Sequence, residues 1–440
     1  MTEIKVRFAP SPTGFMHIGN TRTALFNWLL ARKLGGRFML RIDDTDEQRS
    51  KKEYEDAIRE ALLWLGLTWS EEARQSARRD RYNQVVEKLK ADDRIYACYE
   101  TAEELEFMRK RLMNKGLPPI YDRSALKLTA AQIAAYEAEG RRPHFRFKLN
   151  PGTIEWQDLV RGTCRYQAEN LSDPVIIRED GSFLYHLPSV IDDVDFGITH
   201  IVRGEDHVTN TAAQVQMFEA LGGVIPQFAH LPLLTGKEGK LSKRLGSLGV
   251  RELRADGVEA MAISSFLAKL GTSEAIEAFY DLDTLAATLD FAKLGRSQPK
   301  FDEEELKLFN TRFIHGLPYA AVKDRIDADE NFWLAVRGNL TAVAGIREWE
   351  NICRQKITPV IEDREFTALA AELLPPSPWN ETTFSDWLNA LKNRSGRKGR
   401  DLFHPLRLAL TAAADGPELK TLLPLIGREK AFRRLQGETA

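Results

Sequence analysis

Residues 5–34, KVRFAPSPTGFMHIGNTRTALFNWLLARKL, decide the fold of this chain. Residues 5–9 alternate charged and apolar side chains, a pattern that predicts a short strand. Residues 10–14, PSPTG, interrupt regular structure and predict an open turn. A helix is expected from Asn20, with Asn20 or Thr21 as its cap and Ala24, Leu25, Trp28 and Leu29 on one face. The predicted order is therefore strand, tight loop, helix N-terminus.

This order suits an anion such as a phosphate, because a helix N-terminus offers unpaired backbone N–H groups and the positive end of the helix dipole. His17 stands just before the expected helix, and Gly19 lets a ligand approach the backbone. The alternative is an ordinary strand–turn–helix unit with an incidental histidine.

Length and composition exclude several classes of protein. At 440 residues the chain exceeds what one hydrophobic core organises, so several domains are expected. No run of 18 apolar residues exists, so no membrane partner is expected, and the first residues lack an apolar signal region. Three widely spaced cysteines argue against a disulfide framework and favour the cytoplasm. The net charge of −2 shows no global basic field for nucleic acid, although a local patch would suffice.

The elements that follow predict a parallel sheet with an insertion. A buried strand at 37–42 ends in the polar run DDTD, and helices are expected at 50–66 and at about 80–90. Residues 98–180 are interpreted as an inserted α+β subdomain, with strands at 144–149, 153–159 and 175–177. A further strand is expected at 183–187. The sheet resumes with strands at 199–202 and 230–234, and the chain beyond about 250 is mostly helical.

A second informative stretch is the loop 240–244, KLSKR, which lies among glycines directly after a strand. Three cations in five residues suit a triphosphate whose charge builds up during a reaction. The alternative is a basic surface loop. Neither a P-loop pattern nor a dinucleotide-binding G-x-G-x-x-G pattern follows a strand in this sequence.

Five motifs occur in order: P-S-P-T-G-x-x-H-I-G, R-I-D-D-T-D, Y-H-L-P-S-V-I-D-D, R-G-E-D-H and K-L-S-K-R. The set closely resembles the class I aminoacyl-tRNA synthetases, and specifically the bacterial glutamyl-tRNA synthetases. The resemblance implies an α/β Rossmann-type catalytic domain in two halves (1–97 and 181–235) and an inserted acceptor-binding subdomain (98–180). It also implies a stem-contact region (236–309) and an α-helical C-terminal anticodon-binding region (310–440).

The same resemblance implies an ATP-dependent glutamate–tRNA ligase. His17 would contact the ATP phosphates, with Gly19 and Asn20 beside it. Lys243 would steady the phosphates, and Lys240 and Ser242 would shape the loop. The substrate's own carboxylate would attack ATP, with Mg²⁺ held largely by phosphates and water, to give glutamyl-adenylate. The terminal adenosine of the tRNA would then accept the glutamyl group.

Six residues match family positions around the glutamate. Four of them, Arg7, Ser11, Tyr185 and Arg203, agree with the family pattern, and which arginine meets which carboxylate stays open. Asp43 replaces a glutamate, and Ser189 stands where many members carry asparagine. Asp206 and His207 match the edge of the site. The pair Asp192 and Asp193 is expected at the start of a loop, in structural hydrogen bonds.

Departures from the family bear on metal and tRNA. Zinc-bearing members carry two close cysteines in the insertion, whereas Cys98 has neither a C-x-C partner nor a nearby histidine, so no zinc is expected. Asn339 stands where some members that reject tRNA-Gln carry arginine, so the partner is tRNA-Glu, tRNA-Gln or both. The basic run in 392–400 is either a tRNA contact or a solvated face. A monomer is expected.

Two other functions fit parts of the pattern. One is the shortened relative that attaches glutamate to a modified tRNA base, against which the helical sequence at 310–440 argues. The other is a non-catalytic RNA-binding paralogue, against which the intact His17 and Lys243 argue.

Overall fold

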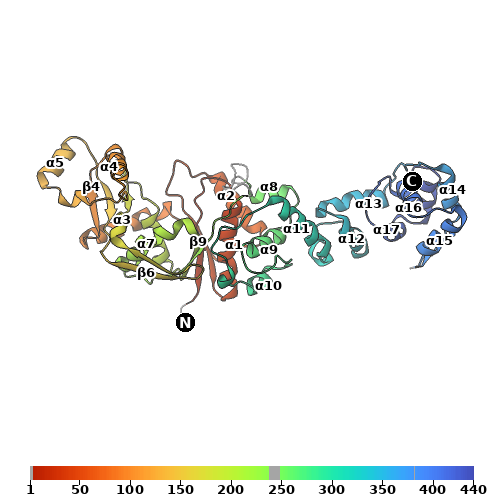
Figure 1. Cartoon of the computed structure of the whole chain (residues 1–440), viewed down its shortest axis with the longest axis horizontal. Coiled ribbons are helices and arrows are strands. Elements are labelled where there is room, and N and C mark those ends of the chain that lie inside the picture. The colour runs from red at the N-terminus through yellow and green to blue at the C-terminus, as the bar shows by residue number, and fades with distance from the viewer. Residues whose placement is uncertain (1–2, 237–247, 381) are drawn as a thin grey trace. The chain divides into compact units, whose positions relative to one another are not determined.

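The computed structural model describes residues 3–236, 248–380 and 382–440. The chain forms two compact units (Figure 1). The first comprises Met1–Leu253 and Ile263–Asp302, and the second comprises Arg254–Ala262 and Glu303–Ala440.

A seven-stranded sheet organises the first unit, and it confirms the α/β Rossmann-type fold. Its strands are parallel except the last, which pairs antiparallel with its neighbour. In spatial order they are β3 (Glu71–Arg74), β2 (Arg37–Ile42), β1 (Lys5–Phe8), β9 (His200–Gly204), β10 (Gln227–Leu231), β6 (Thr153–Asp158) and β7 (Gly162–Gln167).

The strand order reverses between β1 and β9, which pair through Val6 and His200. In open parallel sheets such a reversal opens a crevice outside the carboxyl ends of the two strands. The loop that follows β1 and the Arg203–Gly204 end of β9 both lie at this crevice.

Helices bury apolar faces against the sheet. Among them are α1 (Ile18–Lys33), α2 (Lys52–Trp64), α3 (Arg79–Ala91), α6 (His186–Asp195) and α7 (Val208–Leu221). On α2, Ile58 and Leu62 are buried as the sequence pattern predicts, and so is Leu65 directly after it. A large core cluster is formed by apolar residues of α3, α6, α7 and the strands beside them. Burial of this kind contributes about 25 cal/mol per Å² of apolar surface.

A smaller antiparallel sheet forms the insertion, in the order β4 (Ile95–Cys98), β5 (His144–Phe147) and β8 (Val175–Ile177). Helices α4 (Ala102–Asn114) and α5 (Ala130–Ala138) accompany it. The strands at 153–159 and near 165 do not belong to this sheet, although they lie within the expected insertion. They form the β6–β7 hairpin of the main sheet, because Phe228 of β10 pairs with Asp158.

Three local predictions were wrong. The stretch 183–187 is not a strand: Phe183 makes one bridge to Ile177, and α6 begins at His186. Pro188 lies in the first turn of α6, where the missing N–H would have no helical partner anyway. The cap of α1 is neither Asn20 nor Thr21 but His17. Because α6 begins at His186, Asp192 and Asp193 lie on a helix rather than in a loop.

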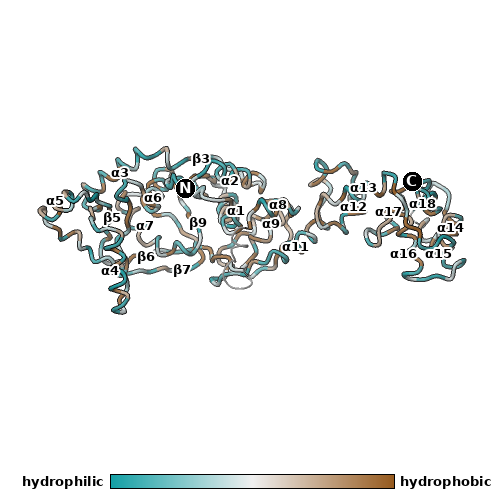
Figure 2. The backbone as a smooth tube through the Cα atoms, turned by 90° about the horizontal axis from the view of Figure 1, so that it is seen from above, coloured by the Kyte–Doolittle hydropathy of each residue, from teal (hydrophilic) through white to brown (hydrophobic). Residues whose placement is uncertain are grey.

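From α11 (Glu303–Gly316) to the C-terminus, the regular elements of the described residues are helical, in agreement with the sequence. Helices α16 (Arg400–Thr411), α17 (Leu419–Ile426) and α18 (Arg428–Leu435) bury leucines against one another, and hydrophobic stretches of backbone gather where they lie together in Figure 2. Among the described residues, none of the helices combines the length and apolar character that crossing a lipid bilayer requires.

Candidate active site

A cavity of about 450 Å³ lies at the β1–β9 crevice. It is lined by residues from the end of β1, the loop after it, the start of α1 and the end of β9. Seven residues singled out from the sequence come together here: Arg7, Ser11, His17, Gly19, Asn20, Tyr185 and Arg203. Asp206 and His207 also line it, whereas Asp43 and Ser189 do not. Lys240, Ser242 and Lys243 lie outside the described residues.

His17 caps α1 with its own ring. Its Nδ1 accepts hydrogen bonds from the backbone N–H groups of Gly19 at 3.1 Å and Asn20 at 3.3 Å. Nδ1 therefore carries no proton, and the neutral ring keeps its proton on Nε2. Burial lowers the pKa of His17, which favours this neutral form. The helix start thus offers the cavity an uncharged Nε2–H donor beside the positive end of the helix dipole.

Arg203 brings a buried positive charge to the cavity. Its Nη1 donates to the hydroxyl of Tyr185 at 2.9 Å, and its Nη2 donates to Thr211 Oγ1 at 2.6 Å. The residue is only 6% exposed, and burial lowers its pKa. Among the ion pairs of the described residues none involves Arg203: its hydrogen bonds go to neutral acceptors, and Asp193 acts on its charge only through space. A buried cation in this state favours an anionic ligand.

Arg7 also lines the cavity, but its charge already has a partner. Its Nε and Nη2 donate to the two carboxylate oxygens of Asp193 at 3.0 and 3.3 Å. Asp193 also accepts from Arg41 Nη1 at 2.7 Å, and its pKa is lowered because these two guanidinium groups outweigh its burial. Arg7 and Arg203 are therefore electrostatically different, although the sequence treats them alike.

Asp43 and Ser189 do not line the cavity because both are bonded to Arg41. Its Nε and Nη2 donate to the carboxylate of Asp43 at 2.7 and 3.0 Å, and Nη2 also donates to Ser189 Oγ at 3.1 Å. Burial raises the pKa of Asp43 to about 6, against the opposing effect of Arg41. The sequence argument missed Arg41, although a charged residue inside the buried run 37–42 was a signal for a buried ion pair.

The pair on α6 is held in hydrogen bonds, as expected. Asp192 accepts from Gln75 at 3.0 Å, from Arg78 at 2.7 Å and from the hydroxyl of Tyr82 at 2.9 Å. Asp193 accepts from Arg7 and Arg41 as described. These bonds tie α6 to β1, β2 and α3 and fix the floor beneath the cavity.

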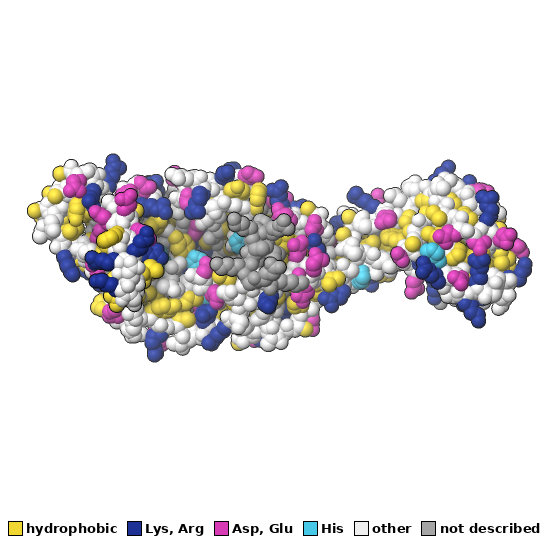
Figure 3. All heavy atoms as spheres, turned by 45° about the horizontal axis from the view of Figure 1, so that its top comes forward, with side chains coloured by type: hydrophobic (Ala, Val, Ile, Leu, Met, Phe, Trp, Pro, Cys, Tyr) yellow, Lys and Arg dark blue, Asp and Glu magenta, His cyan; other side chains and the backbone are white. Residues whose placement is uncertain are grey.

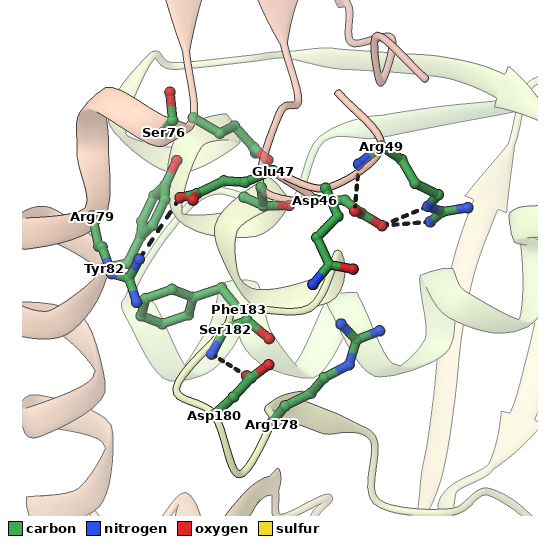
Figure 4. Close-up of a pocket in the computed structure, with 13 residues that line it drawn as sticks. Asp46, Glu47, Arg49, Ser76, Arg79, Tyr82, Arg178, Asp180, Ser182 and Phe183 are labelled. Atoms are coloured by element: carbon green, nitrogen blue, oxygen red, sulfur yellow. Dashed lines mark hydrogen bonds and ion pairs between the residues drawn. The ribbon is translucent and has the colours of Figure 1, made fainter. Parts of the chain in front are cut away.

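A second cavity has a volume of about 610 Å³ (Figure 4). Its walls come from residues 45–49 after β2, from the start of α3 and from the turn after β8. Arg49 pairs with Asp46 at 2.6 Å, and Arg79 lies 3.9 Å from Glu47. Arg178 has no ion-pair or hydrogen-bond partner among the side chains drawn in Figure 4. Backbone N–H groups of Asp43 and Lys51 donate to Pro10 and Pro12 at 3.0 Å, which joins the loops bounding the two cavities.

The insertion holds a cluster that the sequence argument did not foresee. Cys98 and His144 are directly paired across β4 and β5. The prediction that Cys98 has no histidine nearby is therefore wrong, because a histidine distant in sequence lies next to it in the fold. Cys98, Glu100 and His144 each offer one ligand atom, all within 4.8 Å of one another. One feature opposes a metal ion here: the cation Arg146 lies beside the Cys98 thiol. Tyr121 already donates to Glu100 at 2.6 Å.

Charged side chains of both signs are interspersed over the face shown in Figure 3, consistent with the net charge of −2. Within the run 392–400, Arg397 pairs with Asp363 and Arg394 lies 3.8 Å from Glu372. Asn339 is exposed at the end of a short 3₁₀ turn.

The pattern described as "tRNA synthetases class I (E and Q), catalytic domain" matches residues 3–308, and "Anticodon binding domain" matches residues 361–438. The glutamate–tRNA ligase 1 of Maricaulis maris is 53% identical, with 99% of this chain and all of that protein covered. The glutamate–tRNA ligase 2 of a Methylobacterium species is 54% identical, with 99% of each covered.

A solved structure is also similar over nearly its whole length. It is a glutamate tRNA ligase from Elizabethkingia meningosepticum in complex with its amino acid. The two chains align with a TM-score of 0.82 and 27% identity, and 98% of each is covered.

Proposed function

This chain belongs to the glutamate–tRNA ligases of class I, and we propose that it joins glutamate to tRNA through a glutamyl-adenylate formed in the β1–β9 cavity. The observation that carries the proposal is Arg203, a buried guanidinium with neutral acceptors only, facing a cavity that also contains the N-terminus of α1. Such a cavity has two places for negative charge, one for a substrate carboxylate and one for phosphate.

Arg203 binds a carboxylate of the glutamate, with Tyr185 fixing the direction of its guanidinium. The preference over Arg7 follows from charge, because Asp193 already neutralises Arg7. Arg7 and Ser11 line the same cavity and complete the polar wall around the amino acid. A site built to bind a carboxylate rejects an uncharged amide, since the arginine would then be left without its anion.

The phosphates of ATP lie at the start of α1. His17 donates its Nε2 proton to a phosphate oxygen, while Gly19 and Asn20 keep the backbone close to the ligand. The α-carboxylate of glutamate attacks the α-phosphorus, the bond to the bridging oxygen breaks, and pyrophosphate leaves. Lys243 balances the charge that builds on the leaving group, and Lys240 and Ser242 shape the loop that carries it.

In this proposal Asp43 and Ser189 do not contact the substrate but act through Arg41. Both hold Arg41, which shares Asp193 with Arg7, so they set the shape of the wall behind the cavity. A direct contact with the substrate ammonium, the role that the family pattern implies for position 43, requires Asp43 to reach past its pair with Arg41.

The acceptor end of the tRNA enters through the second cavity. Three arginines of its wall, Arg49, Arg79 and Arg178, can contact phosphates, and Arg178 is the one that has no carboxylate partner among the side chains drawn in Figure 4. The hydroxyl of the terminal adenosine then attacks the glutamyl carbonyl carbon, and AMP leaves. The helical C-terminal region, including the basic residues of 392–400, binds the anticodon end, and the exposed Asn339 bears on whether tRNA-Glu, tRNA-Gln or both are accepted.

Use of ATP follows from the family. Mg²⁺ accompanies ATP and is held largely by phosphate and water oxygens. No zinc is required in this proposal, and the nearby charge of Arg146 opposes a second cation at Cys98. The enzyme works as a monomer in the cytoplasm.

The test is glutamate charging of purified tRNA-Glu and tRNA-Gln in separate reactions, with tRNA present in every assay of adenylate formation. We expect attachment of glutamate to at least one of them and dependence on ATP and Mg²⁺. The matched variant Lys243→Ala should lose most adenylate formation and retain tRNA binding. Charging of neither tRNA contradicts the proposed function, and full activity in Lys243→Ala contradicts the role of that residue.

A further inference from the structure

A buried chain of polar groups leads from Arg203 away from the cavity and into the sheet. Arg203 Nε donates to His230 Nε2 at 3.3 Å, and His230 Nδ1 lies 2.5 Å from Asp158 Oδ2. Thr211 Oγ1, which accepts from Arg203, lies 2.9 Å from the same His230 Nε2. The side chains of His230 and Asp158 are both 0% exposed. The three strand residues come from β9, β10 and β6, which are neighbours in the sheet.

The two ring nitrogens of His230 have fixed roles in this chain. Because Nε2 accepts from the guanidinium of Arg203, it carries no proton. The proton of the neutral ring therefore lies on Nδ1 and is donated to the carboxylate of Asp158. The opposite tautomer would place an N–H against Arg203, and an imidazolium would place a second positive charge there.

Asp158 is itself held in one orientation. Its Oδ1 accepts from three backbone N–H groups: Val160 at 3.0 Å, Arg161 at 2.9 Å and His230 at 3.2 Å. Only Oδ2 is then left to face the His230 ring. This carboxylate sits at the end of β6, where the hairpin contributed by the insertion joins the main sheet.

We propose that Asp158 and His230 are positioning residues for the substrate-binding Arg203, with Asp158 selecting the His230 tautomer that accepts from Arg203 Nε. The proposal rests on the proposed function only for its effect on glutamate, since the tautomer itself is a property of the folded chain. Nε, Nη1 and Nη2 of Arg203 each donate to a fixed acceptor, so the guanidinium has one orientation and its remaining N–H bonds are directed to the ligand.

The decisive variant is Asp158→Asn. Three backbone N–H groups hold the side-chain oxygen in the Oδ1 position, so the amide nitrogen must take the place of Oδ2. The amide then donates to His230 Nδ1, and the ring proton moves to Nε2, opposite Arg203. We expect the KM for glutamate to rise about tenfold or more, equivalent to one good hydrogen bond, with the KM for ATP unchanged.

A second pair of variants separates the two ends of the histidine. His230→Gln keeps an acceptor oxygen near the Nε2 position, whereas His230→Asn keeps a donor near Nδ1 and loses the acceptor for Arg203. We expect His230→Gln to stay closer to the wild-type KM for glutamate than His230→Asn does. The matched control is His200→Gln, which removes a buried histidine bonded to Thr199 at the other end of β9 and should leave both KM values unchanged.

The tautomer is read directly by long-range ¹H–¹⁵N NMR of the full chain with labelled histidine. We expect the Nδ1–H form for His230 in the wild type and the Nε2–H form in Asp158→Asn. An Nε2–H form in the wild type overturns the proposal even if no tRNA is charged. An unchanged glutamate KM in Asp158→Asn, or equal rises for glutamate and ATP, also overturns it. If Asp158→Asn does not fold, the histidine variants decide: an equal KM for glutamate in His230→Gln and His230→Asn overturns the proposal.

Discussion

Arg7 and Asp193 form a bidentate ion pair, with Nε–Oδ1 and Nη2–Oδ2 distances of 3.0 and 3.3 Å, and both side chains are almost fully buried. The same carboxylate accepts from Arg41, so one aspartate on α6 balances two arginines on neighbouring strands. This relationship gives Arg7 a structural role, and it is the reason for proposing Arg203 as the residue that binds the substrate carboxylate.

Asp193→Ala should lower the free energy of unfolding by about 3–5 kcal/mol, because it leaves two buried guanidinium groups with less countercharge. Urea denaturation measures the change. The control is Asp283→Ala, which breaks an exposed pair with Arg32 and should have little effect. Equal losses in the two variants would contradict the structural role of Asp193.

Arg203→Lys should lower kcat/KM for glutamate about 10- to 100-fold, since one ammonium group cannot replace the directed bonds to Tyr185 and Thr211. Steady-state charging at varied glutamate concentration measures this. Arg7→Lys is the matched comparison and should lower stability more than Arg203→Lys does. A larger glutamate effect in Arg7→Lys would reverse the assignment of the two arginines.

His17→Asn separates the two roles of the histidine, which are to cap α1 through Nδ1 and to donate from Nε2 to a phosphate. Asparagine is a good helix N-cap, so stability should change little, whereas His17→Ala should cost about 1 kcal/mol. Both variants lose the Nε2–H donor, and we expect adenylate formation to fall about 100-fold in each. Rapid-quench measurement of adenylate and thermal unfolding give the two readouts. Normal adenylate formation in His17→Asn would exclude the phosphate contact.

Arg178→Ala should raise the KM for tRNA several-fold and leave the KM values for glutamate and ATP unchanged, because Arg178 lines the second cavity only. Losing one phosphate contact should also reduce the slope of log K against log salt by about 1. Arg165→Ala, on the exposed β7 hairpin, is the control. An unaltered tRNA KM in Arg178→Ala would place the acceptor end elsewhere.

Stability should fall as the pH drops from about 6.5 towards 4. Burial, together with the charge of Arg203, lowers the pKa of His186 to about 4. Below the unfolded pKa near 6.5 the unfolded chain therefore binds a proton that the folded chain does not, at about 1.4 kcal/mol per pKa unit. Urea unfolding of wild type and His186→Gln at pH 7.5 and 5 isolates this contribution from that of carboxyl groups such as Asp43. Identical pH dependence in the two proteins would contradict it.

Much of the local structure could be predicted from the sequence. The strand at 37–42, the helical C-terminal region and the strand–loop–helix order of 5–34 are as expected, because alternation and helical periodicity are local properties. The errors arose where another interaction overrides the pattern. Residues 183–187 read as a strand, but Pro188 and the contacts of Asp192 and Asp193 place a helix there.

The candidate site was also predictable in part. Seven of its residues line one cavity, because the motifs that carry them follow strands whose carboxyl ends meet at one edge of the sheet. Arg41, Asp158 and His230 on strands and Thr211 on α7 were missed, since a buried polar side chain gives no indication of its partner until distant elements come together.

The sequence by itself determined the family and the reaction class, and it predicted the residues of the candidate site, since ordered motifs and short-range periodicity are written along the chain. Only the tertiary structure decided which arginine is free. Arg7 and Arg203 are equivalent as letters in a sequence, but the fold places Asp193 against one and a neutral histidine held by Asp158 against the other. The physical reason is that the state of a buried charge depends on which carboxylates distant segments bring within hydrogen-bonding distance.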